Sequence, residues 1–303
     1  MRHIVLAIAV LTTVPAWATP MPFRQRVVPV SGFVSDGVIA GRARCGASTW
    51  LLTDTRTLVE VRVTARSIVS KTVRGFATGE HPWGLACVGA GELWTLVGSR
   101  TLARLSASGE VTSRTKLRQP RLNVFGVGDM LLLQQPPGVA GSPLIVAARA
   151  VDVNRAAPWP GPIAERQSSP KIDVPSALVA CGLAYEATLP CWITNQTRIT
   201  VSDGTSSRTS SVHPRFVTSA AVDTSVPLWD VAVARSSVLW ILTSGVSAEG
   251  GRRVGARLTR SNLRGDDLGA VDLMPRARII VSADEQRVIV LTVAGTLMEV
   301  IAP

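Results

Sequence analysis

The sequence predicts an all-β protein built from repeated units of about 40–50 residues, and three observations lead to this class. The apolar runs are short, rich in β-branched residues and bounded by Gly, Ser, Asn or Asp. No long segment carries helical periodicity. One core run recurs along the chain, as Thr49–Leu52, Leu93–Leu96, Met130–Leu133, Cys191–Thr194, Leu239–Leu242 and Val288–Leu291.

The best-preserved unit is Glu80–Val111. It contains three apolar runs, Gly84–Val88, Glu92–Val97 and Thr101–Leu105, and a fourth strand is expected at Glu110–Leu117. Four-stranded units repeating at this period are typical of a β-propeller. We therefore predict one propeller of six four-stranded blades. Seven blades are the alternative, because the third unit is long.

The two ends of the repeated region complement each other. The last unit, Ile279–Val300, supplies only three strands, whereas Arg26–Phe33 is an apolar strand with no unit of its own. Pairing this N-terminal strand with the last blade would close the propeller and cover an open sheet edge, which would otherwise favour aggregation.

The first residues have the pattern of a signal peptide. Arg2 and His3 form a basic start, Ile4–Val14 is apolar, and Ala16-Trp17-Ala18 matches a small-x-small cleavage site. We predict that residues 1–18 are removed and that residues 19–303 form the propeller domain. The chain is then exported to the periplasm or the extracellular space, with no stable membrane insertion after cleavage. An uncleaved anchor is the alternative.

Composition narrows the possible partners. The chain has 303 residues, 46% of them hydrophobic and 17% charged, which argues against global disorder. Its net charge is +11, from 32 basic and 21 acidic residues. The arginines are scattered singly instead of forming a block, so we interpret the charge as Arg-biased composition and expect no nucleic-acid partner.

The four cysteines favour disulfides over a metal site. Cys45, Cys87 and Cys181 occupy equivalent places in the first run of their units, and Cys191 lies in the second run of the fourth. In an oxidising compartment we expect a Cys181–Cys191 bond across one hairpin and a Cys45–Cys87 bond between neighbouring units. Reduced, buried cysteines are the alternative for the second pair. No C-x-x-C motif is present, so no metal is predicted.

The stretch HPWGLAC…GELWTL…TLARLSASGEV, within residues 81–111, resembles the repeats of NHL-type and streptogramin-lyase-like six-bladed propellers. The resemblance implies the propeller fold, and such repeats occur in enzymes, ligand binders and scaffolds. In streptogramin lyases a His and a Glu near the central funnel act as acid and base with Mg²⁺. Only Glu80 and His81 resemble that pair here, and carboxylates for a metal are too few, so we predict no cofactor.

Six of the eight tryptophans fall into two groups. Those in register within the second runs, Trp50, Trp94, Trp192 and Trp240, are expected to pack between blades. Trp83 and Trp229 instead precede or begin first runs, where they would line the mouth of the funnel and stack a ligand, or else seal the blade tops.

Further candidates for ligand or partner binding lie at equivalent junctions, namely His213, Arg215 and Asp230. No familiar catalytic motif is present in the sequence. We therefore expect a binding protein or scaffold that recognises a protein, or else a small-molecule ligand, through one face of the propeller. A small-molecule lyase or lactonase-type hydrolase acting in the central funnel is the alternative.

Overall fold

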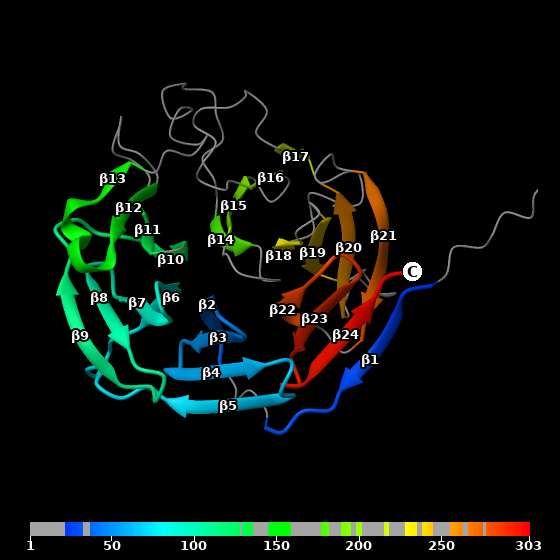
Figure 1. Cartoon of the computed structure of the whole chain (residues 1–303), viewed down its shortest axis with the longest axis horizontal. Coiled ribbons are helices and arrows are strands. Elements are labelled where there is room, and N and C mark those ends of the chain that lie inside the picture. Colours follow the sequence, from blue (N-terminus) through cyan, green and yellow to red (C-terminus); the bar gives the residue numbers. More distant parts are fainter. Residues whose placement is uncertain are drawn as a thin grey trace, which may run out of the picture.

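Six four-stranded antiparallel sheets surround a common centre in the described part of the chain (Figure 1). The structure is a computed structural model that describes residues 22–32, 37–127, 129–135, 145–158, 177–181, 189–194, 198–201, 215–217, 228–234, 238–244, 255–262, 266–274 and 277–303. The predicted all-β propeller is confirmed.

The signal peptide predicted at residues 1–18 lies outside the described residues. Among those described, no helix is long and apolar enough to cross a membrane.

Each sheet is named by its strands in chain order. The first comprises β2 (Ile39–Cys45), β3 (Ser48–Thr53), β4 (Thr57–Arg62) and β5 (Ser67–Thr72). The second comprises β6 (Pro82–Val88), β7 (Glu92–Val97), β8 (Thr101–Leu105) and β9 (Val111–Lys116). The third comprises β10 (Asn123–Val127), β11 (Met130–Gln134), β12 (Ile145–Arg149) and β13 (Ala157–Pro158), with the 3-10 helix η1 (Ala150–Arg155) before β13.

The remaining sheets follow the same order. The fourth comprises β14 (Ala177–Cys181), β15 (Leu189–Thr194), β16 (Arg198–Val201) and β17 (Arg215–Val217). The fifth comprises β18 (Leu228–Val233), β19 (Val238–Ser244), β20 (Ala256–Asn262) and β21 (Asp267–Leu273). The sixth comprises β22 (Ala277–Ala283), β23 (Arg287–Thr292), β24 (Leu297–Ile301) and β1 (Arg24–Val28).

The N-terminal strand pairs with the last sheet, as predicted. β1 runs antiparallel to β24, with Arg24 opposite Ile301 and Val28 opposite Leu297. The strand begins two residues earlier than the predicted Arg26–Phe33 and ends five residues earlier. It ends before Pro29, because proline has no N–H with which to continue a ladder.

The first strands of neighbouring sheets approach closely, and glycine permits this. A Cβ added to Gly41 of β2 would lie 2.3 Å from the carbonyl carbon of Gly84 in β6. A Cβ added to Gly126 of β10 would lie 2.0 Å from the carbonyl oxygen of Cys87. Any side chain at these positions would force the sheets apart, so the tight centre of the fold depends on glycine here.

Three in-register tryptophans fill the spaces between sheets. Trp50 joins a buried cluster with Leu85 and Leu93 of the next sheet. Trp94 packs likewise with the third sheet, and Trp240, which is fully buried, packs with the sixth. The Trp240 indole N–H donates to the Asp284 carbonyl over 2.7 Å, so its polar atom is satisfied. The predicted packing role is confirmed for these three, and the side chain of Trp192 lies outside the described ones.

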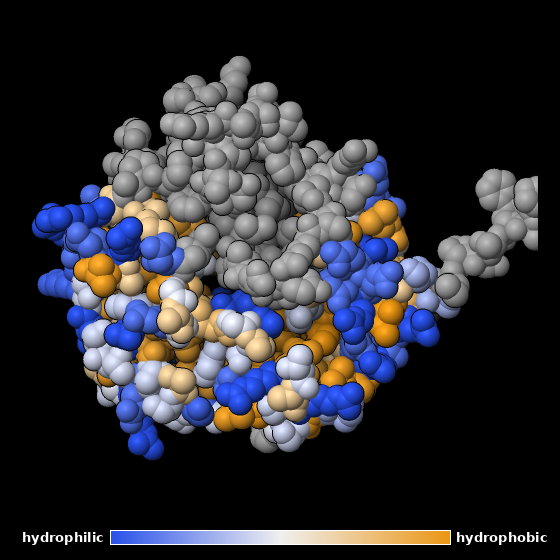
Figure 2. All heavy atoms as spheres, viewed as in Figure 1, coloured by the Kyte–Doolittle hydropathy of each residue, from blue (hydrophilic) through white to orange (hydrophobic). Residues whose placement is uncertain are grey.

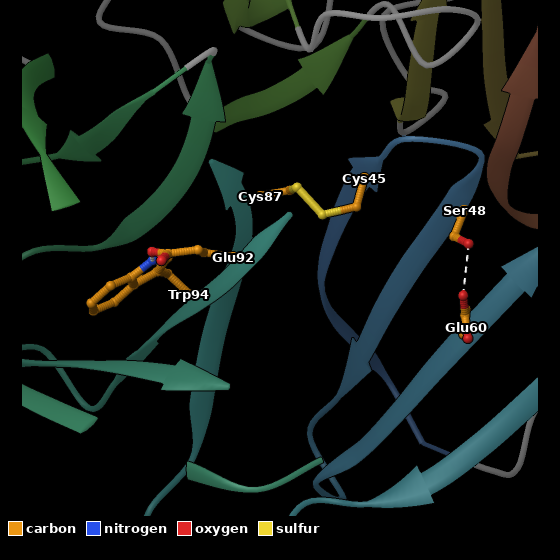
Figure 3. Close-up of a disulfide and its surroundings, with 6 residues drawn as sticks. All are labelled: Cys45, Ser48, Glu60, Cys87, Glu92 and Trp94. Carbon is orange, nitrogen blue, oxygen red and sulfur yellow. Dashed lines mark hydrogen bonds between the residues drawn. A yellow bond between two sulfur atoms is a disulfide. The ribbon is translucent and has the colours of Figure 1, made fainter. Parts of the chain in front are cut away.

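One predicted disulfide is present. Cys45 and Cys87 join the ends of β2 and β6 with their Cα atoms 5.7 Å apart, beside the Ser48–Glu60 hydrogen bond (Figure 3). The backbone register of β14 and β15 places Cys191 opposite Val179, two residues away from Cys181. The side chains of that second pair lie outside the described ones, so the Cys181–Cys191 bond stays a prediction.

Candidate functional site

Large apolar side chains are exposed where the first strands begin. We call this side of the propeller the lead-in face. Val38, Trp83 and Leu122 lie directly before or at the start of β2, β6 and β10, and they are 68%, 55% and 45% exposed. Exposed Met274 lies on the connection to β22, and exposed Val293 lies in the β23–β24 turn, which antiparallel pairing places on the same side.

The exposed apolar side chains are thus concentrated on one side. The described residues include nine exposed large apolar side chains, and five of them belong to this group. Figure 2 shows one face of the molecule, where hydrophobic patches lie among hydrophilic side chains. Clustered apolar exposure on a folded domain marks an interaction surface more often than scattered exposure does.

Local backbone geometry accounts for the exposure of Trp83. The pairing of β6 with β7 shifts register between Trp83 and Ala86, and a shift of this kind changes the direction of a side chain. Gly84, with φ of 67°, allows this conformation. A Cβ on Gly84 would also lie 2.0 Å from Asn123 Oδ1. Close packing against the neighbouring β10 therefore requires glycine directly after Trp83.

Trp229 occupies a similar backbone position. The pairing of β18 with β19 shifts register between Leu228 and Asp230, on either side of Trp229. The backbone therefore repeats at β18 the irregularity seen at Trp83. The side chains of Trp229 and of Arg215, in β17, lie outside the described ones, and His213 lies outside the described residues altogether.

A buried ion pair lies at the centre of the fold. Arg42 of β2 donates to the Asp230 carboxylate of β18, and both side chains are at most 5% exposed. Arg42 also donates to the Ile280 carbonyl of β22 over 2.8 Å, and the Ile280 N–H donates to Asp230 over 2.6 Å. Asp230, which the sequence predicts as a binding residue, therefore connects three sheets, and its carboxylate is not presented to solvent.

The Glu80 carboxylate is engaged by neighbouring groups of the protein. Its carboxylate accepts two 2.7 Å hydrogen bonds from the Arg114 guanidinium of β9 and a third from the Ala77 N–H. The Arg114 hydrogen bonds are the main cause that lowers the Glu80 pKa to about 2. Glu80 is thus ionised near neutral pH and is no proton donor there. His81 is exposed, and its carbonyl accepts from the Gly98 N–H.

Replacing Glu80 by Gln is expected to lower the free energy of unfolding by about 0.5–1 kcal/mol at pH 7, since the pair is partly exposed. Because the pKa is lowered in the folded state, this stabilisation exists above the unfolded value near 4.5 and disappears as the pH falls toward 2. Urea unfolding of both proteins at pH 7, 4 and 2 measures the difference. A difference that stays constant over this range would contradict the assignment.

Sequence reasoning missed four residues of this region: Val38, Arg42, Arg121 and Leu122. Val38 and Leu122 were detectable, because they occupy the same place before a first run as the conspicuous Trp83. Arg42 gave a weaker signal, as one of two arginines within a strand whose other residues are small or apolar. In the described part of the chain, no group of three or more His, Cys, Asp or Glu side chains is arranged to hold a metal ion.

The sequence matches no protein-family model and no curated protein sequence. The structure is similar to that of virginiamycin B lyase from Staphylococcus aureus, with a TM-score of 0.50 and 10% sequence identity over 93% of this chain and 100% of the lyase chain. The fold is a streptogramin-lyase-like β-propeller.

Two further structures are similar to this propeller. A catalytically inactive variant of the same lyase, solved with quinupristin, has a TM-score of 0.51 at 11% identity over 93% of this chain and 100% of that chain. YCF48 bound to a D1 peptide has a TM-score of 0.49 at 13% identity, over 93% and 98% of the two chains. At such identities the similarity describes the fold of the propeller and not its activity.

Proposed function

We propose that this propeller is an exported binding protein that recognises a protein partner through its lead-in face. The observation that carries the proposal is the exposure of Trp83, with Val38 and Leu122 exposed at the starts of the two adjacent first strands. Tryptophan contributes large contact area at little cost in conformational entropy, and it is enriched among the residues that dominate binding energy.

Binding is favoured over catalysis because two candidate carboxylates, Glu80 and Asp230, already have other partners. Glu80 is ionised and paired with Arg114, and Asp230 is buried against Arg42. A lyase or lactonase would need a carboxylate or imidazole free to exchange a proton with its substrate. Neither of these two carboxylates meets that requirement.

Export is supported by the N-terminal pattern together with the Cys45–Cys87 bond. Disulfides persist mainly in oxidising compartments such as the periplasm and the extracellular space. In such a compartment the propeller would act on partners outside the cytoplasm.

Replacing Trp83 by Ala is expected to weaken partner binding at least tenfold, about 1.4 kcal/mol, because it removes the largest exposed apolar side chain of the face. The mature chain, residues 19–303, would be cross-linked in the exported fraction of its source, and its stoichiometric partner then purified and titrated. Val151→Ala is the matched control, since Val151 is 94% exposed in η1, which follows a third strand and lies away from the lead-in face.

The two variants separate the possible outcomes. Loss of binding in Trp83→Ala with normal binding in Val151→Ala supports the lead-in face. Equal binding by Trp83→Ala and the wild type would overturn the proposal. Turnover of a lactone panel without any stoichiometric partner would overturn it in favour of the enzyme.

A further inference from the structure

Arginines surround the exposed apolar residues of the lead-in face. Arg56 and Arg100 lie in the turns between the second and third strands of the first two sheets. Arg121 directly precedes Leu122, and Arg278 lies at the start of β22, where it donates to the Gly37 carbonyl. None of the four forms an ion pair with any carboxylate in the described part of the chain.

Two described acidic residues of the same side, Asp54 and Glu80, already have local partners. Asp54 accepts from the Val38 N–H over 2.8 Å, and Glu80 accepts from Arg114 and the Ala77 N–H. In the described part of the chain, the charge that the lead-in face leaves available is therefore positive.

Arg121 is the most unusual of the four arginines. It is only 7% exposed, and its Nη1 donates to three neutral oxygens, those of Gln119, Pro120 and Gln135, over 3.1–3.3 Å. Its Nε is buried and has no hydrogen-bond partner among the described atoms. A buried charge without a counter-ion is costly, and its field is screened less than that of an exposed charge. A negative group brought to this surface would offset part of that cost.

Backbone contacts place Arg121 close to the apolar residues. The Arg121 N–H donates to the Ser99 carbonyl over 2.7 Å, in the turn that follows the partner strand of Trp83. Leu122, the next residue, is exposed, and Asn123 after it lies against Gly84. Apolar contact and positive potential are therefore available within one continuous stretch of surface.

We propose that the lead-in face binds a polypeptide segment in which acidic residues alternate with apolar ones, and that Arg121 supplies the dominant attraction for its carboxylates. This inference rests on the proposed binding function and names the chemistry of its partner. The apolar residues favour a polypeptide over a nucleic acid or a glycan, because their exposed area needs apolar groups to cover it. The unpaired arginines favour an acidic segment over a neutral one.

The test uses two end-capped, fluorescein-labelled peptides and the mature chain. In one peptide, Glu and Asp alternate with Leu and Phe; in the other, Gln and Asn replace the acids. Fluorescence anisotropy would measure both affinities at about 50 and 500 mM NaCl, which change the screening length several-fold. We expect the acidic peptide to bind at least tenfold more tightly at low salt, and this preference to shrink at high salt.

Variants then assign the effect to Arg121. Arg121→Gln is expected to reduce affinity for the acidic peptide about tenfold, with little change for the neutral peptide. Arg121→Lys keeps the charge and should retain most of the preference. Arg118→Gln is the matched control, because Arg118 is an exposed arginine of the same connection, and it should change affinity less than about twofold. Thermal melting of each variant verifies that it is folded.

Each contrary result has a distinct meaning. Equal affinities for the two peptides would overturn the acidic-partner inference. The proposed binding function would still hold in that case if Trp83→Ala weakened binding of the natural partner. An unchanged Arg121→Gln would overturn the role of Arg121. Tighter binding of heparin or of phosphatidylglycerol vesicles than of the acidic peptide would overturn the choice of a polypeptide.

Discussion

Replacing Asp230 by Ala is expected to lower the free energy of unfolding by about 3–5 kcal/mol, the typical cost of leaving one partner of a buried ion pair uncompensated. The change removes the counter-ion of Arg42 and leaves the Ile280 N–H without its 2.6 Å acceptor. The first, fifth and sixth sheets lose a common contact as a result. Urea unfolding, followed by tryptophan fluorescence, measures the loss.

Two further variants test whether the pair itself is the cause. Arg42→Met combined with Asp230→Ala removes the isolated buried charge and should recover part of the loss. Asp272→Ala removes the partner of Arg257 in an exposed pair at 3.6 Å and should cost less than about 1 kcal/mol. A cost for Asp230→Ala no larger than that of Asp272→Ala would contradict the role of the central pair.

Replacing both Cys45 and Cys87 by Ala is expected to cost about 4 kcal/mol. The bond closes a loop with a sequence separation of 42, and the chain-entropy relation gives this magnitude for such a loop. It also joins β2 to β6, at the far end of the strands from Trp83. Chemical denaturation of the double variant and the wild type measures the difference.

Reducing conditions provide the matched comparison for the disulfide. With a strong reductant, the wild type should approach the stability of the double variant. Partner binding at the lead-in face should change little under these conditions below the unfolding transition. If the reductant leaves the wild type as stable as before while free-thiol labelling shows Cys45 and Cys87 reduced, the stabilising role of the bond is wrong.

Local pattern was sufficient to predict the architecture. Strand periodicity and the recurring second run indicated four-stranded units, because alternation and turn residues are properties of neighbouring positions. The positions of Trp50, Trp94 and Trp240 in register likewise indicated packing between sheets, which the structure confirms. The extra N-terminal strand was recognisable because the last unit contained one strand too few.

The roles of single polar residues were harder to predict. Asp230 looked available because it follows Trp229 at a junction between units, and Glu80 because, with His81, it resembles the acid–base pair of streptogramin lyases. Their partners, Arg42 and Arg114, are 188 and 34 residues away in the chain. No local pattern distinguishes a carboxylate that meets such a partner from one that faces solvent, because the pairing depends on how sheets are placed around the centre.

The candidate site likewise contains residues that the sequence indicates and residues that only the structure reveals. Trp83 was recognisable from its position before a first run, whereas Arg121 became notable only when its burial and the unpartnered Nε were visible. The sequence by itself therefore determined the repeat, the strand order and the residues between sheets, since these follow from periodicity along the chain. Only the tertiary structure decided which charges are neutralised, because desolvation and ion pairing depend on distances between segments far apart in sequence.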